Sequence, residues 1–531
     1  MPLLAALAVG AALRLPVVGR PLLSDDEAIY AATADAMRQG ARLYLDVVDH
    51  KPPLIYFLYE VGFALTGAFN TLGAHLLVIL AVLATAIALW ALGRRGPAGE
   101  TGGVVAAALF LVFSTTWHDY DALAANCELF LLAPQSLAAW LVLRTSAAAN
   151  AGAPGPRSQF LTGHLAIGVL IGLSAMCKYQ GLTFLGVSVG FLVVDVVRAR
   201  LSLPAAALAV VIQIVGVALP IAGFCAWAQA RGSLDASLDW FRFNFLYVGA
   251  GLTGGQALRR GLTRLMMIAA AALPVYLLGA RGAVTTAAAW LRAGLARGRV
   301  PEASVGAAAS DASVDRLGLL WLLTSIIALC AGGRFFGHYF HLILAPLALL
   351  AAPPFLNLWR RSGLARVLLT VAAGIPALAF FLLATIGREA AAAIDEGEPP
   401  YDRVAAAIAA ASAPDERMFV WGNSPQLYIL ARRSMGTRFS FCNYMTGESP
   451  GTDTETGTKN ADTNVLPVSW TMLFQDLEQR RPALFVDAAA AGWDGYAKFP
   501  LSRYPQLGAY LAAHYRKVGE ADHVVLYRRS P

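Results

Sequence analysis

The chain has 531 residues, of which 57% are hydrophobic and 14% are charged. This composition is too apolar for a soluble globular protein and is typical of polytopic membrane proteins. The net charge of +7 is modest, and no basic patch with interleaved aromatic residues occurs, which argues against a nucleic-acid-binding protein. The five cysteines form no CxxC pair, so neither a structural zinc site nor a disulfide framework is indicated.

Apolar runs predict about eleven membrane-spanning helices, counted against the roughly 20 residues that cross a bilayer. They are expected at 2–19, 70–92, 103–117, 127–143, 164–177, 180–197, 204–229, 262–280, 317–332, 339–357 and 367–386. We interpret the first as a retained helix rather than a cleaved signal peptide. The pair around Lys178 could instead be one broken or re-entrant segment.

In this arrangement of predicted spans, the basic residues and the acidic residues lie on opposite sides of the membrane. The basic loops contain Arg94, Arg95, Arg144, Arg157, Arg198, Arg200, the segment 281–316, Arg360, Arg361 and Arg366. The acids on the other side are Asp25, Asp26, Glu27, Asp46, Asp49, Asp119, Asp121, Glu128, Asp235 and Asp239. Because cytoplasmic loops are enriched in Lys and Arg, the acidic side is predicted to lie outside the cytoplasm. We expect the protein in the inner (plasma) membrane.

The composition changes from about residue 387. Helix-like DRVAAAIAAA is followed by RMFVWG, ALFVDA and HVVLYRR, which read as short strands, and a helix is expected near 504–516. Alternating helices and strands predict a small extracytoplasmic α/β domain over 387–531. The Gly/Thr/Asp-rich stretch 446–466 is interpreted as a flexible loop, and 281–316 as a mobile connector. The predicted fold is thus a polytopic α-helical membrane domain, 1–386, with a first external loop at 20–69, followed by this domain.

The external segment that follows the first apolar run carries three adjacent acids. Asp26, Tyr30 and Thr33 lie at i, i+4 and i+7 and therefore share one helical face. A carboxylate at the membrane surface can act as a general base. The alternative is that Ser24 and the acids only cap the helix, which explains one acid well and three poorly.

Lys51-Pro52-Pro53 opens an apolar, aromatic helix that includes Tyr56 and is expected to lie along the membrane surface. A lysine at a helix N-terminus, where free N–H groups point outward, suits a phosphate. A snorkelling lysine is the alternative.

Further polar residues stand at the outer ends of apolar runs. Glu128 lies at the mouth of one span, where a carboxylate is expensive to bury and is a candidate functional group. Lys178 either snorkels or contacts a lipid phosphate. Arg334 and His338 are four residues apart and are followed by Tyr339, and the forked donors of arginine suit phosphate oxygens.

Other residues outside the membrane have two readings. Asp119 and Asp121, in the segment His118-Asp119-Tyr120-Asp121, are better explained as a solvated loop than as a site. The aromatic segment 240–247 is either an interfacial anchor or a wall for a lipid or sugar. No ligand spacing supports a metal site, so the need for a divalent cation stays open.

Together these residues resemble a known group of enzymes. The pattern D-E-A-x-Y, then G-x-x-x-Y-x-D-x-x-x-x-K-P-P-L-x-Y, is carried by Asp26-Glu27-Ala28-Ile29-Tyr30, Gly40, Tyr44, Asp46 and Lys51-Pro52-Pro53-Leu54-Ile55-Tyr56. It resembles the polyprenyl-phosphate-sugar glycosyltransferases of the GT-C superfamily, in particular the bacterial branch of the protein O-mannosyltransferase family (family 39), which includes lipid A aminoarabinose transferase-like enzymes. The later motifs around Glu128, Lys178 and Arg334 to Pro346 also fit.

This resemblance implies an inverting transferase whose site faces away from the cytoplasm. By resemblance Asp26 is the catalytic carboxylate that deprotonates the acceptor, Glu27 is its acidic neighbour, and Lys51 and Arg334 hold the lipid phosphate. The expected substrate-binding set is Lys51, Tyr30, Tyr56, Glu128, Lys178, Arg334, His338 and Tyr339. The implied partners are a polyprenyl-phosphate-linked sugar donor, membrane lipids and an envelope glycan, lipid or protein acceptor. No inserted β-trefoil is recognised, which leaves a protein acceptor in doubt.

Two other classes of function remain as alternatives. A transporter or lipid-linked sugar flippase would explain the spans and the boundary charges, although it would not need a concentrated acidic and basic external loop. A non-catalytic scaffold whose C-terminal domain binds a partner is the second alternative.

Overall fold

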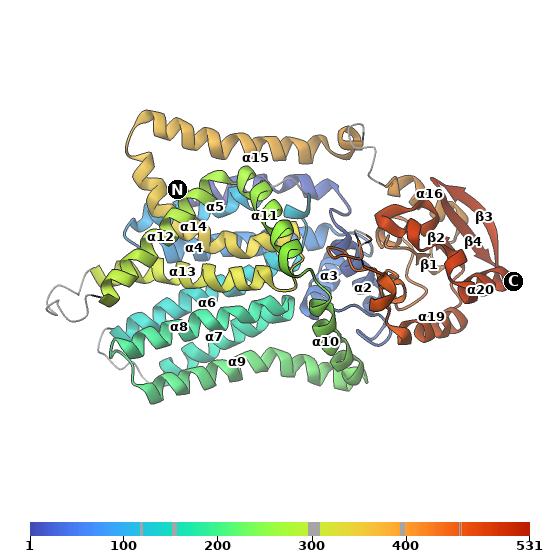
Figure 1. Ribbon diagram of the computed structural model, residues 1–531, viewed down its shortest axis with the longest axis horizontal. Helices are drawn as coiled ribbons and strands as arrows, with labels where there is room; N and C mark the ends of the chain where they lie inside the picture. Colours follow the sequence, from blue (N-terminus) through green and yellow to red (C-terminus); the bar gives the residue numbers. More distant parts are fainter. Residues whose placement is uncertain (117–119, 151–156, 296–307, 393–398, 456, 458) are drawn as a thin grey trace.

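Long apolar helices make up the first part of the chain, and a smaller α/β unit follows them (Figure 1). The computed structural model describes residues 1–116, 120–150, 157–295, 308–392, 399–455, 457 and 459–531. Within these residues eight helical segments are long and apolar enough to span a membrane, or nine if one bent pair counts as a span. The spanning helices are α4 (Leu72–Gly93), α6 (Cys127–Asn150), α7 (Arg157–Cys177), α8 (Phe184–Val197), α9 (Leu203–Ala230), α13 (Ala308–Cys330), α14 (His341–Trp359) and α15 (Gly363–Ala392).

The remaining predicted spans are shorter or bent. The bent pair is α11 (Gly254–Ala271) and α12 (Leu273–Leu295), which meet at 110°. The spans predicted at 2–19 and 103–117 correspond to the short apolar helices α1 (Pro2–Ala12) and α5 (Gly99–Phe113). The predicted multi-span helical fold is therefore confirmed. The prediction of a loose connector over 281–316 was wrong where the structure describes it, because α12 and α13 continue into that segment.

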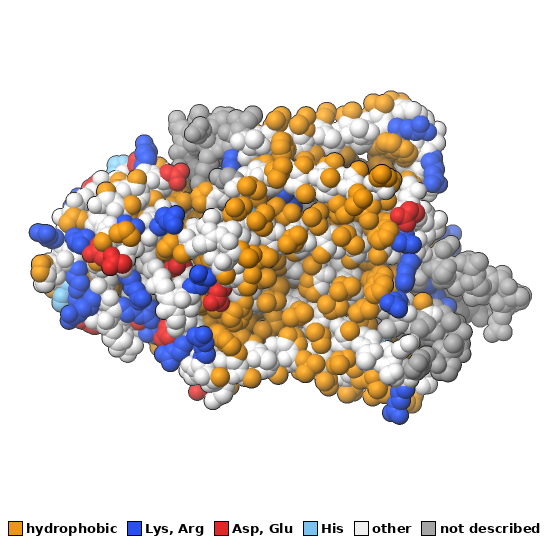
Figure 2. Space-filling view, turned by 180° about the vertical axis from the view of Figure 1, so that it is seen from behind, with side chains coloured by type: hydrophobic (Ala, Val, Ile, Leu, Met, Phe, Trp, Pro, Cys, Tyr) orange, Lys and Arg blue, Asp and Glu red, His pale blue; other side chains and the backbone are white. Residues whose placement is uncertain are grey.

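Lipid-facing surface surrounds the helical part. Large apolar side chains project outward from the spanning helices, for example Val211 on α9 and Leu378 on α15, which are 56% and 57% exposed. Figure 2 shows them as a continuous hydrophobic band, with the charged α/β unit on one side and a rim of Lys and Arg on the other. Such a band is covered by hydrocarbon in a bilayer.

The segment 20–69, which we call the external segment after its predicted side of the membrane, lies between the spanning helices and the α/β unit (Figure 1). Its helices are α2 (Asp25–Arg38) and α3 (Leu54–Thr66). Ser24 caps α2 by accepting a hydrogen bond from the Glu27 N–H at 3.3 Å. Two glycines let α3 pack directly on α4, because a Cβ at Gly73 would lie 2.1 Å from the carbonyl oxygen of Gly62. This close approach fixes α3, and hence the loop before it, against the membrane domain.

The C-terminal unit is a four-stranded mixed sheet with helices, as predicted. The strand order is β1 (Met418–Trp421), β2 (Leu484–Asp487), β4 (Val524–Arg529), β3 (Tyr515–Ala521), with β1 parallel to β2 and the other pairs antiparallel. Its helices are α16 (Tyr401–Ala411), α17 (Gln426–Leu430), α18 (Asn443–Thr446), α19 (Pro467–Arg480) and α20 (Pro505–His514). The helix expected to reach 516 stops at His514, and β3 begins at the next residue.

The first half of the stretch 446–466 is packed, and the described residues of its second half are mostly exposed. Thr446, Glu448, Ser449 and Thr454 are all buried, and the Ser449 N–H donates to the Thr454 hydroxyl at 3.0 Å. The interpretation as a flexible loop was therefore wrong for 446–454.

Several contacts attach the C-terminal unit to the external segment. Phe439 forms an isolated parallel bridge with Val48, and the Arg480 guanidinium donates to the Asp46 carbonyl oxygen at 2.9 Å. Gln426 on α17 donates to the Asp25 carboxylate on α2. The two parts thus enclose polar residues between them.

Candidate active site

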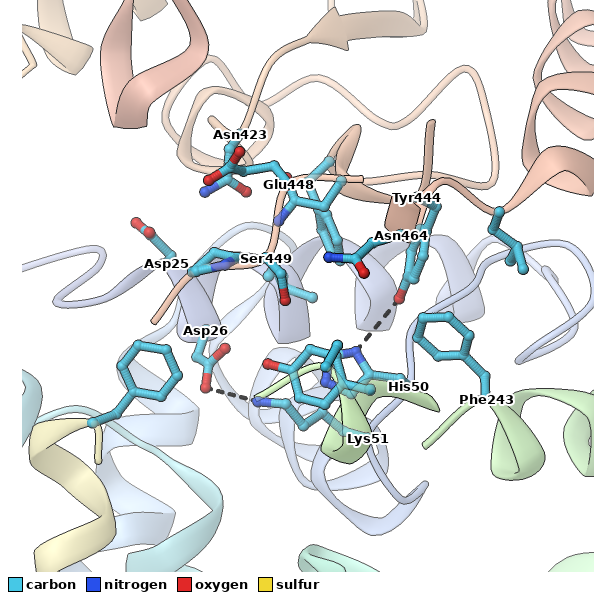
Figure 3. A pocket seen from close by; sticks show the side chains of 18 of the residues that line it. Asp25, Asp26, His50, Lys51, Phe243, Asn423, Tyr444, Glu448, Ser449 and Asn464 are labelled. Atoms are coloured by element: carbon cyan, nitrogen blue, oxygen red, sulfur yellow. Dashed lines mark hydrogen bonds and ion pairs between the residues drawn. The ribbon is translucent and has the colours of Figure 1, made fainter. Parts of the chain in front are cut away.

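A cavity of about 650 Å³ lies where the external segment, the spanning helices and the C-terminal unit meet. Its floor includes Asp26, Lys51, Asp121, His338 and Tyr339. Its roof comes from the C-terminal unit, and Figure 3 shows these side chains above Asp26 and Lys51. The labelled roof residues are Asn423, Tyr444, Glu448, Ser449 and Asn464.

The Asp26 carboxylate and the Lys51 ammonium are in direct contact at the cavity floor. Lys51 Nζ lies 2.8 Å from Asp26 Oδ2, and the Tyr30 hydroxyl donates to the same oxygen at 3.1 Å (Figure 3). Burial alone would raise the pKa of Asp26, but the charges of Lys51, His338 and Lys178 outweigh it, and the pKa lies well below its usual range. Asp26 is therefore ionised at neutral pH. The predicted i, i+4 pairing of Asp26 with Tyr30 is confirmed.

Lys51 is presented by a tightly held loop. Asn244 Nδ2, on the neighbouring helix α10 (Leu234–Gly249), donates to the His50 carbonyl oxygen at 2.7 Å. Tyr56, on the first turn of α3, donates to the Asp49 carboxylate at 2.7 Å. Tyr44 has the uncommon backbone φ of 68° and donates to the Lys51 carbonyl oxygen. These bonds fix the backbone of Lys51 and leave its ammonium directed at Asp26.

Glu128 and Lys178 form a second ion pair behind the floor. Both side chains are almost fully buried, at 1% and 6% exposure, and they are in hydrogen-bond contact. The Lys178 ammonium also lies over the Tyr339 ring, 3.8 Å from its centre. The structure thus joins two residues that are 50 positions apart, although neither lines the cavity itself.

Asp121 and His338 form a third pair. His338 Nδ1 contacts the Asp121 carboxylate, and the His338 backbone N–H donates to it at 3.2 Å. Burial would raise the pKa of Asp121, but the charge of His338 lowers it below the usual range. The interpretation of Asp121 as part of a solvated loop was therefore wrong, because Asp121 is buried. His118 and Asp119 lie outside the described residues.

The donor set does not match a divalent metal centre. Asp26, Glu128 and Asp121 each have a cationic or imidazole partner, so their charge is already balanced by Lys51, Lys178 and His338. Within the part of the chain that the structure describes, no group of three His, Cys, Asp or Glu side chains is arranged to hold a metal ion.

Three predicted site residues have other partners. Glu27 is fully buried and faces away from the cavity, accepting hydrogen bonds from the Leu23 N–H at 2.7 Å and lying 3.0 Å from His75 Nε2. Tyr56 supports Asp49, and Tyr30 is buried beside Asp26. These residues position the site and do not line it.

Arg334 also has a role that differs from the one predicted. Its guanidinium donates to the Tyr247 carbonyl oxygen at 2.9 Å, to the Ser449 hydroxyl at 3.0 Å and to the Pro450 carbonyl oxygen. It stacks on the Tyr247 ring at 3.8 Å and is 2% exposed. Arg334 therefore joins the membrane domain to the C-terminal unit, and it does not itself line the cavity.

The aromatic segment 240–247 is a helix, α10 (Leu234–Gly249), rather than a loop. Phe243 and Tyr247, four residues apart, line the cavity. Phe241 and Phe245, on the opposite face, are 45% and 70% exposed. One face of the helix therefore lines the cavity, and the opposite face is exposed.

Sequence reasoning did not identify the roof residues or His50. His50 lines the cavity and pairs with Asp49 at 2.9 Å, and its place beside Lys51 was an available signal. The roof residues Asn423, Asn443, Tyr444 and Asn464 have no motif of their own. Only the fold brings them over the floor.

The chain resembles a known protein family and several solved structures. Residues 50–224 match the family described as dolichyl-phosphate-mannose-protein mannosyltransferase. The crystal structure of ArnT from Cupriavidus metallidurans bound to undecaprenyl phosphate aligns with a TM-score of 0.60 and 15% identity, covering 99% of this chain and 97% of that one. The protein has the fold of the GT-C glycosyltransferase superfamily. The fold predicted from the sequence motifs is thereby confirmed.

Archaeal relatives show the same fold. The Archaeoglobus fulgidus oligosaccharyltransferase, in a crystal structure with Zn and sulfate, aligns with a TM-score of 0.55 and 13% identity, covering 100% of this chain and 73% of that one. The same organism's AglB, in complex with an inhibitory peptide and a dolichol-phosphate, aligns with a TM-score of 0.54 and 12% identity, covering 99% and 74%. A comparison with curated protein sequences found no match.

Proposed function

We propose that this GT-C protein is an inverting glycosyltransferase that moves a sugar from a polyprenyl-phosphate carrier to an acceptor hydroxyl outside the cytoplasm. The Asp26–Lys51 pair carries the proposal, because it places a carboxylate base beside a cation suited to a phosphate leaving group, inside one cavity. The undecaprenyl phosphate in ArnT and the dolichol-phosphate in AglB support a polyprenyl phosphate as the carrier.

The chemistry follows from these two side chains. Asp26 accepts the proton of the acceptor hydroxyl, whose oxygen attacks the anomeric carbon from the face opposite the phosphate. The bond from that carbon to the phosphate oxygen breaks, and the configuration at the carbon inverts. Lys51 stabilises the charge that develops on the departing lipid phosphate. When the phosphate engages Lys51, the ammonium is drawn from Asp26, which frees the carboxylate for the acceptor.

The charge pattern supports a site on the extracytoplasmic side of the inner membrane. Arg94 follows the end of α4, and Arg360 and Arg361 follow the end of α14, at the ends of these helices remote from the cavity. Basic residues at those ends favour a cytoplasmic location for them. The cavity and the C-terminal unit then lie outside the cytoplasm.

The acceptor is an envelope glycan, a lipid or a protein, and the cavity roof is where it would bind. Asn423, Asn443 and Asn464 offer amide donors and acceptors, and Tyr444 adds an aromatic ring with a hydroxyl. Such side chains can orient a hydroxyl-bearing molecule over Asp26.

The test is a reaction of the purified protein with labelled polyprenyl-phosphate sugars and an envelope extract. We expect release of polyprenyl phosphate, appearance of label in an acceptor, and an anomeric configuration opposite to that of the donor by NMR. Transfer of intact donor across a vesicle bilayer without release of phosphate would contradict the proposal and favour the flippase alternative.

A further inference from the structure

One nitrogen of His338 is buried at the site without a partner. Its ring is held on one side by Asp121, which binds Nδ1, and is stacked parallel to Phe336 at 5.8 Å. Nε2 is fully buried and has no hydrogen-bond partner among the described residues. It lies 3.8 Å from Asp26 Oδ2 and 3.9 Å from Glu128 Oε1, both too long for hydrogen bonds.

The contact with Asp121 determines which nitrogen of the neutral imidazole carries the proton. Because Nδ1 and the Asp121 carboxylate are in contact, the Nδ1 proton is donated to Asp121. In the charged ring Nε2 carries a proton and helps to balance the neighbouring carboxylates, and in the neutral ring it carries a lone pair that can accept a proton. A buried ring nitrogen without a hydrogen-bond partner is rare in folded proteins and calls for a reason.

The charged and titratable groups around this ring come from several elements. They are Asp26 on α2, Lys51 before α3, Asp121 on the 3₁₀ turn η2 (Tyr120–Ala122), Glu128 on α6, Lys178 after α7, and Tyr339 and His341 beside His338. Three carboxylates thus meet two lysines. A protonated His338 would bring this cluster to neutrality.

The proposed reaction releases one proton, which a residue of the site must accept. An acceptor hydroxyl and a singly charged phosphodiester become a glycoside, a phosphomonoester with a second ionisable oxygen, and a proton. Asp26 removes that proton from the hydroxyl, but the charges of Lys51 and Lys178 favour the ionised carboxylate and make it a weak base.

We infer that His338 Nε2 accepts the proton that Asp26 removes from the acceptor hydroxyl, and that Asp121 orients the imidazole for this transfer. The inference rests on the proposed function and adds a residue to it. The lone pair of the acceptor oxygen forms the new bond to the anomeric carbon, and the electrons of the broken bond leave with the phosphate. The proton passes from that oxygen to Asp26 and then to Nε2, giving an imidazolium between Asp121 and Glu128.

The distances are compatible with this step. A hydrogen bond between Nε2 and Asp26 needs a heavy-atom separation of about 2.8 Å, roughly 1 Å shorter than the observed 3.8 Å. Release of Lys51 to the lipid phosphate removes the competing partner of Asp26 Oδ2. Hydrogen bonds of this kind often tighten only when substrate is bound.

The first test is the pH dependence of the single-turnover rate. Only neutral His338 can accept the proton, so the wild-type rate should fall as the pH drops through the pKa of the imidazole. His338→Gln should lower the rate roughly 10- to 100-fold and abolish this acid limb, with little change in donor KM. Asp121→Asn removes the charge that favours the imidazolium and should move the limb to lower pH by about one unit.

His164→Gln is the matched control. His164 is another buried histidine, it lies 2.9 Å from Gln213 on the spanning helices, and it does not line the cavity. Its replacement should leave the acid limb unchanged. If His338→Gln slows the enzyme but keeps the wild-type acid limb, the histidine has a structural role only and the inference is overturned. Restoration of the His338→Gln rate by added Mg²⁺ or Mn²⁺ would also overturn it.

A second measurement does not depend on turnover. Titration of the protein with polyprenyl phosphate, in two buffers of different ionisation enthalpy, gives the number of protons taken up on binding. Wild type should take up clearly more than His338→Gln, since the bound phosphate charge favours the imidazolium. Equal uptake contradicts the inference. A wild-type protein that shows this difference but releases no phosphate from any donor would contradict the proposed function and not the role of His338.

Discussion

Replacement of Lys51 by methionine removes the charge that we assign to the lipid phosphate while keeping a side chain of similar length. Lys51 is 11% exposed, so its contacts are poorly screened by water. A charge-assisted hydrogen bond of this kind contributes about 1.5–3 kcal/mol. We therefore expect Lys51→Met to weaken polyprenyl phosphate binding roughly 10- to 150-fold. The unpaired charge of Asp26 adds repulsion and favours the upper part of this range.

The same substitution has a consequence for pH dependence. Lys51 is the nearest of the cations that hold the pKa of Asp26 low, and burial alone raises that pKa. Without Lys51 the pKa of Asp26 rises, so the carboxylate becomes protonated at a higher pH. The acid limb that belongs to Asp26, as distinct from that of His338, should therefore move to higher pH in the variant.

The assay is equilibrium binding of labelled polyprenyl phosphate to the purified protein, followed by the pH dependence of the rate. Lys459→Met is the matched control, because Lys459 also lines the cavity but is exposed and belongs to the roof. Its effect on binding should be several-fold smaller. Binding by Lys51→Met within twofold of wild type, or an equal loss in Lys459→Met, would refute the assignment.

Two further predictions concern the architecture of the site. Glu128→Gln and Lys178→Met should each destabilise the protein by about 3–5 kcal/mol, since each leaves a buried charge unpaired, and the double variant should recover much of this loss in thermal unfolding. Strict additivity would show that the two residues do not interact. Arg334→Leu should lower the unfolding temperature and leave donor affinity within threefold of wild type, as expected of a residue that joins the membrane domain to the C-terminal unit. A tenfold loss of donor affinity at unchanged stability would restore its predicted phosphate role.

Much of the fold could be predicted from the sequence because its signals are local. Apolar runs of sufficient length identify spans such as α4 and α9, and the arginines between them indicate the sides of the membrane. The Asp26–Tyr30 pair follows from helical spacing alone. Strands β1, β2 and β4 were readable because β-branched and aromatic residues cluster in them, whereas β3, with the sequence YRKVGEA, was not predicted.

The site was only partly predictable because its pairs are distant in the sequence. His338 and Asp121 are 217 positions apart, so an acid that looks solvated in its own loop is buried by a residue from another helix. Arg334 carried the right chemistry for phosphate, but its direction depends on Ser449 and Pro450 in the C-terminal unit. Side-chain direction at a helix boundary cannot be read from composition.

The central claim is that Asp26 is the base of a sugar transfer from polyprenyl phosphate, and Asp26→Asn tests it most directly. The measurement is release of polyprenyl phosphate from a labelled donor by the purified variant, alongside binding of polyprenyl phosphate. We predict a loss of turnover of about 10²- to 10⁴-fold with binding retained, because the amide cannot accept a proton while Lys51 stays free for the phosphate. Turnover close to that of wild type would contradict the account.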